Sequence, residues 1–142
     1  MEINLNLNKI YYKAGYKYQL SYDYNIHIPI FPKKVIITDF ISLTINGYLT
    51  VRKDYAWDGP SGPTIDTKSF MRGSLVHDVL YQLIREGLLP KEYRERADEL
   101  LGTICLEDGM LKIRAWWVYR SVRRLAGFAA NPKNKKEIIQ AP

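Results

Sequence analysis

The side chains whose types and spacing could carry out chemistry lie around His77, one of two histidines in the sequence. Asp78 follows it directly, Tyr81 lies at i+4, and Asp98 belongs to a later segment. A histidine that is bonded to a carboxylate through one ring nitrogen has a fixed tautomer, and its other nitrogen can take a proton from water. We therefore interpret His77, Asp98 and Tyr81 as the candidate catalytic residues of a hydrolase.

A helical hairpin is needed to bring Asp98 to His77. Residues 68–86 predict a helix, because apolar side chains recur at helical spacing, among them Phe70, Leu75, Leu80, Leu83 and Ile84. Gly87 is a natural helix stop, and a second helix is predicted over about 91–106. If the two helices fold back at Gly87, His77 lies opposite Asp98, with Tyr81 one turn along from His77 on the same face.

The segment between Trp57 and Asp66 is a candidate metal-binding loop. Its two glycines and two prolines exclude regular structure. Asp78 is expected to point toward this loop, about 100° around the helix from His77. Its carboxylate, together with loop oxygens, could supply the ligands that Ca²⁺ prefers, and a hard cation there would stabilise an oxyanion. The predicted metal residues are Asp78, Asp58, Gly59, Ser61 and Gly62.

The fold predicted for the whole chain is α+β, as one domain over residues 1–142. Residues 1–57 read mostly as an antiparallel β-sheet. The Asn46-Gly47 pair predicts a hairpin with a two-residue turn that places Leu43 and Ile45 on one face with Leu49 and Val51. The loop over 58–66 leads into a helical half over 67–127, whose third helix spans about 111–126. Residues 128–142 read as a polar tail.

Composition narrows the function classes. The net charge of +6 suits an anionic surface such as phospholipid, whereas nucleic-acid binding rests on charge alone and ranks last. Two histidines far apart in the sequence and a single cysteine argue against a zinc site, which normally needs about three such ligands. Cys105 is expected to be buried and inert. Without an apolar run long enough to span a bilayer or a signal pattern at the start, the sequence predicts a cytoplasmic protein.

Two alternatives stay open at the candidate site. His77 could be a buried histidine that is merely satisfied by Asp98, with Tyr81 as a packing residue. A Ser-His-Asp triad using Ser61 or Ser74 is another possibility, although the sequence contains no Gly-x-Ser-x-Gly elbow. His27 lies between two isoleucines in a strand pattern, and we interpret it as structural.

The site region resembles the catalytic helix pair of the phospholipase A2 superfamily, closest to the disulfide-free type in parvovirus minor capsid proteins. The motifs that carry the resemblance are His77-Asp78-x-x-Tyr81, Gly87-x-x-Pro90 and Ala97-Asp98. The resemblance implies that His77 is the general base, Asp98 its orienting partner, Tyr81 a brace for Asp98 and Asp78 a calcium ligand. The loop from Asp58 departs from the family pattern, with an extra acidic residue and an added proline.

A second resemblance, to the phage-encoded domain of unknown function 1353, covers more of the chain. Its motifs here are Asp58-Gly59-Pro60-Ser61, His77 to Tyr81, Ala97-Asp98 and Tyr119-Arg120-Ser121-Val122-Arg123. This resemblance implies a bacteriophage viral protein, made in the cytoplasm of the bacterial host and in one alternative incorporated in the virion. We therefore expect either a calcium-dependent phospholipid hydrolase or a non-catalytic virion, tail or host-directed protein that uses the same pocket for binding.

Overall fold

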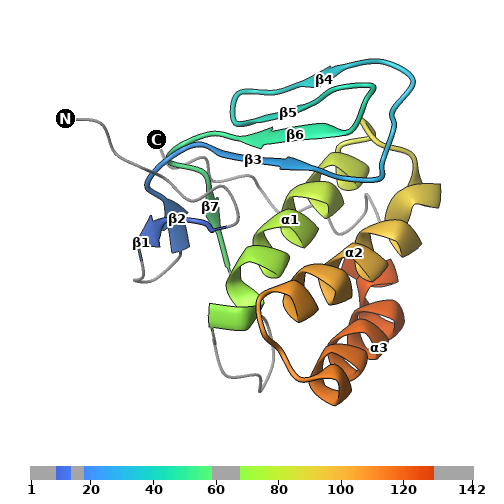
Figure 1. Cartoon of the computed structure of the whole chain (residues 1–142). Coiled ribbons are helices and arrows are strands. Elements are labelled where there is room, and N and C mark those ends of the chain that lie inside the picture. The colour runs from blue at the N-terminus through green and yellow to red at the C-terminus, as the bar shows by residue number, and fades with distance from the viewer. Residues whose placement is uncertain (1–8, 14–17, 59–67, 130–142) are drawn as a thin grey trace. The chain divides into compact units, whose positions relative to one another are not determined.

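A computed structural model describes residues 9–13, 18–58 and 68–129. It confirms the predicted α+β class, with antiparallel strands followed by three helices (Figure 1). The chain divides into two compact units between Asp58 and Gly59, and each unit is described by itself. The prediction of a single domain stays a prediction, and the predicted polar tail lies almost entirely outside the described residues.

The first unit contains two antiparallel sheets. One has the strand order β1-β2-β7 and the other β3-β6-β5-β4. The strands are β1 (Tyr12–Lys13), β2 (Tyr18–Leu20), β3 (Tyr24–His27), β4 (Ile36–Ile37), β5 (Ile41–Leu43), β6 (Tyr48–Val51) and β7 (Ala56–Trp57). His27 Nε2 donates a 2.8 Å hydrogen bond to the carbonyl of Asn46, and the ring stacks on Tyr48, which suits the structural role predicted for it.

The Asn46-Gly47 hairpin is present, but the prediction of a two-residue turn was wrong. Leu43 pairs with Leu49, so the loop has three residues and Ile45 lies in it, 52% exposed. The Gly47 amide donates to the Thr44 carbonyl at 3.0 Å, and Gly47 has φ +88°. A tight turn closed by a left-handed glycine adds one residue to the loop and shifts the strand register by one.

The second unit contains the helices α1 (Lys68–Arg85), α2 (Arg94–Glu107) and α3 (Lys112–Ala129), with a short 3₁₀ turn, η1 (Lys91–Tyr93), before α2. Helix α1 is followed by a turn at Gly87, where the Leu88 amide donates to the Leu83 carbonyl at 2.9 Å and Gly87 has φ +76°. Helix α2 is followed in the same way by Gly109, which has φ +94°, and the Met110 amide donates to the Cys105 carbonyl at 2.9 Å. Only glycine adopts this conformation without a steric cost, so the ends of both helices follow from the local sequence, and the stop predicted at Gly87 is present.

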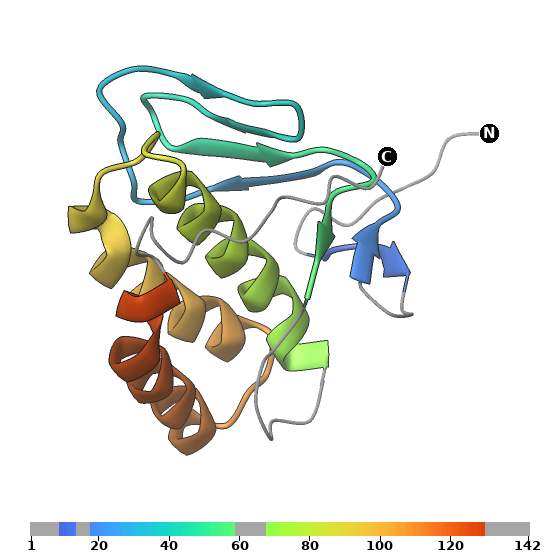
Figure 2. The same ribbon diagram turned by 180° about the vertical axis from the view of Figure 1, so that it is seen from behind.

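Helix α2 packs against both α1 and α3 (Figure 2). Side chains from all three helices and the turn before α3 form one buried cluster of Phe70, Leu101, Cys105, Met110, Ala115 and Val118. Cys105 is fully buried, as predicted, and burial raises the pKa of its thiol to about 12. Gly73 allows the close approach of α1 to α2, because a Cβ there would lie 3.0 Å from Leu101 Cδ1.

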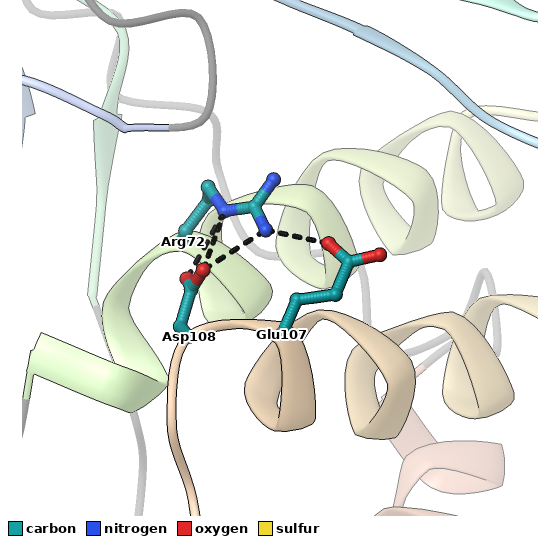
Figure 3. Close-up of polar contacts among 3 residues, drawn as sticks. All are labelled: Arg72, Glu107 and Asp108. Carbon is teal, nitrogen blue, oxygen red and sulfur yellow. Dashed lines mark hydrogen bonds and ion pairs between the residues drawn. The ribbon is translucent and has the colours of Figure 1, made fainter.

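The start of α1 is tied to the end of α2 by a buried arginine (Figure 3). Arg72 Nε donates to Asp108 Oδ2 at 3.0 Å, and Arg72 Nη2 donates to Glu107 Oε2 at 2.7 Å. The Arg72 side chain is 5% exposed, against 19% for Asp108 and 57% for Glu107. We call these three residues the Arg72 cluster. It joins the two helices that carry the candidate site.

Candidate active site

Asp98 is the centre of the candidate site. Its side chain is fully buried, and its Oδ1 atom lies 2.7 Å from His77 Nε2 and accepts a hydrogen bond from the Tyr81 hydroxyl at 2.6 Å. His77 and Tyr81 come from adjacent turns of α1, and Asp98 from the second turn of α2. The predicted hairpin therefore places these three residues together as expected, while their catalytic role stays a prediction.

Arg123 is a fourth member of the site. Its Nη1 atom donates to Asp98 Oδ2 at 2.8 Å, so both carboxylate oxygens have partners and α3 is joined to the helix pair. Sequence reasoning did not place Arg123 in the site. The available signal was its position in the closing segment of the phage-domain resemblance, after Tyr119 and Val122. We call His77, Tyr81, Asp98 and Arg123 the Asp98 cluster.

The electrostatics of the Asp98 cluster keep the aspartate ionised. Burial alone would raise the pKa of Asp98, but hydrogen bonds from His77 and Tyr81, the charge of His77 and the bond from Arg123 together lower it below 3.8. Burial raises the pKa of the Tyr81 hydroxyl, and its bond to Asp98 raises it further, so Tyr81 remains a neutral donor. An ionised Asp98 can only accept hydrogen bonds, so His77 Nε2, which is bonded to it, must carry a proton.

The other ring nitrogen of His77 faces a different environment. His77 Nδ1 lies 3.9 Å from Asp78 Oδ1, and the side chains of His77 and Asp78 are 11% and 36% exposed. Burial lowers the pKa of His77, but hydrogen bonding and charge from Asp78 and Asp98 outweigh it, and the pKa lies above 6.5. The ring packs on Tyr81 with centroids 4.3 Å apart, which restricts its rotation. His77 thus has one nitrogen held by Asp98 and one basic nitrogen beside a half-exposed carboxylate.

The alternative nucleophile Ser74 is engaged in its own helix. The Ser74 hydroxyl is buried and donates to the Met71 carbonyl at 2.8 Å. Ser61, the other serine considered, lies outside the described residues. Ser74 is therefore held within α1 and is not positioned as a nucleophile, whereas the Ser61 alternative stays a prediction.

The predicted calcium ligands are only partly described. Gly59, Ser61 and Gly62 lie outside the described residues, and Asp58 belongs to the first unit. Within the described part of the chain, no group of three or more histidine, cysteine or acidic side chains is placed to hold a metal ion. Asp78 alone does not make a calcium site, since Ca²⁺ takes about six to eight oxygen ligands.

Comparisons of this chain with models of known protein families, with curated proteins and with solved structures give no match. Among the described residues, no helix is both long enough and apolar enough to cross a membrane. The functional assignment of this chain therefore depends on the Asp98 cluster and its surroundings.

Proposed function

We propose that this protein is a phage-encoded ester hydrolase of the phospholipase A2 type, with phospholipid as its substrate class. The observation that carries the proposal is the bonding of His77 Nε2 to a fully buried, ionised Asp98. That bond orients the ring and leaves Nδ1 as its basic nitrogen, on the side of the half-exposed Asp78.

The reaction that this geometry supports is hydrolysis by an activated water molecule. His77 Nδ1 takes a proton from water as the water oxygen attacks the ester carbonyl carbon. The resulting imidazolium is stabilised by Asp98, which remains an anion because Tyr81 and Arg123 also bond to it. When the tetrahedral intermediate collapses, the carbon–oxygen bond to the alcohol breaks, and His77 Nδ1 returns the proton to the leaving oxygen.

Calcium is proposed as a cofactor, with Asp78 as one of its ligands. A bound Ca²⁺ would stabilise negative charge on the carbonyl oxygen. Isothermal titration of the wild type and of Asp78→Asn with Ca²⁺ tests this part by itself. We expect heat of binding in the first protein and none in the second, and silence in both would remove calcium from the proposal.

The hydrolase proposal is tested by phospholipid turnover in the presence and absence of millimolar Ca²⁺. We expect His77→Gln to lower the rate about 10²–10⁴-fold, the usual contribution of a general base. His27→Gln is the matched control, because His27 lies in the first unit and bonds only to the turn at Asn46 among the interactions described. Equal rates in wild type and His77→Gln would contradict the proposal.

A second candidate function is favoured by one observation. His77 is 9% exposed and Asp98 is fully buried with a partner at each oxygen, which also describes a satisfied polar network in a protein core. In that case the protein would be a non-catalytic virion or tail component, or a host-directed effector. Its presence in purified virions, together with no hydrolysis of any phospholipid, would favour this function over the first.

A further inference from the structure

Helix α3 has two apolar faces, although a helix at a protein surface normally has one. Its inner face is used by the core, where Ala115 and Val118 are buried and Val122 packs against the same cluster. The opposite face carries large apolar side chains as well. Ile113 is 69% exposed and Trp117 is 60% exposed. The packing of α3 in its own unit therefore does not account for these outward apolar residues.

The outer face of α3 combines these apolar residues with arginines. We define it by residues at helical spacing on one side: Ile113, Trp116, Trp117, Arg120 and Arg124. Arg120 lies over the Trp116 ring, with its guanidinium carbon 5.3 Å from the ring centroid. Leu111, directly before the helix, is also exposed, at 74%. Tryptophan rings beside aliphatic and basic side chains are typical of helices that lie in a membrane interface.

The charge on this helix has a single sign. Helix α3 contains one lysine and four arginines and no acidic residue. Arg123 is held by Asp98, whereas Arg120 and Arg124 are exposed on the outer face. An anionic surface complements this pattern. A symmetric contact with a second copy would place like charges close together, with no acidic residue from the helix between them.

Lipid also explains the aliphatic residues better than nucleic acid does. Single-stranded nucleic acid would use the tryptophans for base stacking and the arginines for phosphates. Nucleic acid would leave Leu111 and Ile113, the two most exposed apolar side chains of this region, without an apolar contact. Acyl chains at the boundary with the headgroups would cover both of them.

We propose that the outer face of α3 docks this protein on anionic phospholipid surfaces. The proposal rests on the proposed function for its substrate class, but docking does not require the chemistry of His77. It assigns separate tasks to neighbouring arginines. Arg123 holds the Asp98 cluster, and Arg120 and Arg124 contact the lipid headgroups.

The test measures co-sedimentation of the full chain with vesicles, using the His77→Gln background so that hydrolysis does not alter them. We expect binding to phosphatidylcholine vesicles that contain phosphatidylglycerol, and much weaker binding to phosphatidylcholine alone. The double change Arg120→Gln with Arg124→Gln should weaken binding about thirty-fold, as about 1 kcal/mol per basic residue predicts. The double change Trp116→Ser with Trp117→Ser should weaken it roughly ten-fold or more.

Two controls separate the outer face from general charge and hydrophobicity. Ile37→Ser removes an exposed apolar side chain of β4 that is 74% exposed, and it should not change binding. A triple change of Lys133, Lys135 and Lys136 to glutamine removes more charge than the α3 pair and should have a smaller effect. Quenching of tryptophan fluorescence by brominated acyl chains gives a second measurement on the wild type, since Trp57 is 3% exposed.

Several results would overturn the proposal. They are equal binding to neutral and anionic vesicles, no binding to either, unchanged binding in both α3 variants, or loss of binding only in the lysine variant. A dimer that dissociates on Trp117→Ser, without lipid binding, would show that the face pairs with a second copy instead. Vesicle binding by a wild type that hydrolyses no phospholipid would contradict the proposed function while supporting the docking face.

Discussion

The Arg72 cluster and the Asp98 cluster both join α1 to α2 through charged groups, but their charges are arranged in opposite ways. In the Arg72 cluster the buried group is a cation, and its two carboxylate partners are 19% and 57% exposed. In the Asp98 cluster the buried group is an anion, with His77 11% and Arg123 26% exposed around it. In both clusters the buried charge is satisfied by several polar or charged partners.

The difference between the clusters is in proton chemistry. A guanidinium keeps its charge at every relevant pH, so the Arg72 cluster has no proton to exchange near neutrality. The Asp98 cluster contains an imidazole, whose charge changes within the physiological range. The Arg72 cluster therefore only holds α1 to α2, whereas the Asp98 cluster is also a candidate acid–base site.

The largest effect that separates the clusters is expected from Asp98→Asn. An amide cannot hold both His77 and Arg123 as a carboxylate does, and the tautomer of His77 is no longer fixed. We expect phospholipid turnover to fall about 10³–10⁴-fold, the size seen when an orienting aspartate is replaced in a catalytic triad. Initial rates on vesicles, corrected for the folded fraction by circular dichroism, measure it. Turnover within about threefold of wild type would show that Asp98 has only a structural role.

The reciprocal change, Arg72→Met, should affect stability and spare activity. It removes the buried cation, but Glu107 and Asp108 can regain water because both are partly exposed. We expect the free energy of unfolding to fall by about 2–3 kcal/mol, below the cost of stranding a fully buried charge. Urea unfolding followed by circular dichroism measures it. A loss of turnover per folded molecule would show that the Arg72 cluster also affects the candidate active site.

The two titrating groups of the Asp98 cluster should make stability depend on pH in opposite directions. The pKa of His77 is raised in the folded protein, so its contribution to stability is complete below about pH 6.5 and is lost as pH rises through the folded pKa. Asp98, with a lowered pKa, contributes above its ordinary value of 3.8 and loses this contribution as pH falls further. The proposed hydrolysis needs neutral His77, so turnover should rise about tenfold per pH unit below the pKa of His77.

As pH rises, the contribution of His77 to stability should decrease while turnover increases, and wild type and His77→Gln are enough to measure both. The stability difference between wild type and His77→Gln should shrink from about pH 5.5 to about pH 9, while wild-type turnover increases over the same range. Arg72→Met should show the same stability loss at both values. A stability difference for His77→Gln that grows with pH would contradict the raised pKa.

A smaller effect is expected from Tyr81→Phe. The change removes the 2.6 Å hydrogen bond to Asp98 and leaves His77 and Arg123 in place. We expect a stability loss of about 1.5 kcal/mol, typical of a hydrogen bond to a charged group, and a modest decrease in turnover. Tyr48→Phe is a suitable control, because Tyr48 is 58% exposed in β6. Equal stability of wild type and Tyr81→Phe would show that the hydroxyl does not support Asp98.

The smallest effect concerns the helix contact beside Arg72. In Gly73→Ala the new Cβ would lie 3.0 Å from Leu101 Cδ1 and 3.1 Å from Cys105 Sγ. Overpacking should outweigh the helix propensity of alanine and destabilise the fold by about 1 kcal/mol. Gly102→Ala is the matched control, since its nearest contact is Tyr119 Cβ at 3.9 Å, and it should stabilise by about 0.5–1 kcal/mol. Thermal unfolding measures both variants, and a Gly73→Ala protein more stable than Gly102→Ala would contradict the tight contact at Gly73.

Local sequence was enough to predict the α1–α2 hairpin and the facing of His77 and Asp98. The glycine stop at Gly87 and the apolar spacing fix two helices of known length, and the short turn between them sets the register. The hairpin at Asn46-Gly47 was also predicted, but its register was wrong by one residue. The pair permits more than one loop length, and the pairing of Leu43 with Leu49 decides between them.

Arg123 and the Arg72 cluster could not be predicted in the same way. Each depends on which helix faces are apposed, and five basic residues of α3 were equivalent in the sequence until packing oriented the helix. Only Arg123 reaches Asp98, because Val118 and Val122 turn that side of α3 toward the core. Outward-facing tryptophans likewise could not be distinguished from core residues by spacing alone.

The sequence by itself determined the α+β class, the end of α1 before Gly87 and the identity of the His77–Asp98 pair, because these follow from local periodicity, glycine conformation and a short turn. The predicted limits of the other helices were wrong by a few residues, since α2 begins at Arg94 after a 3₁₀ turn and α3 continues to Ala129. Tertiary structure decided the third partner of Asp98, the burial of Asp98 among the partners that keep it ionised, and the exposure of Trp116 and Trp117. These properties arise from the packing of segments distant in sequence, which determines the desolvation and the electrostatic partners of each side chain.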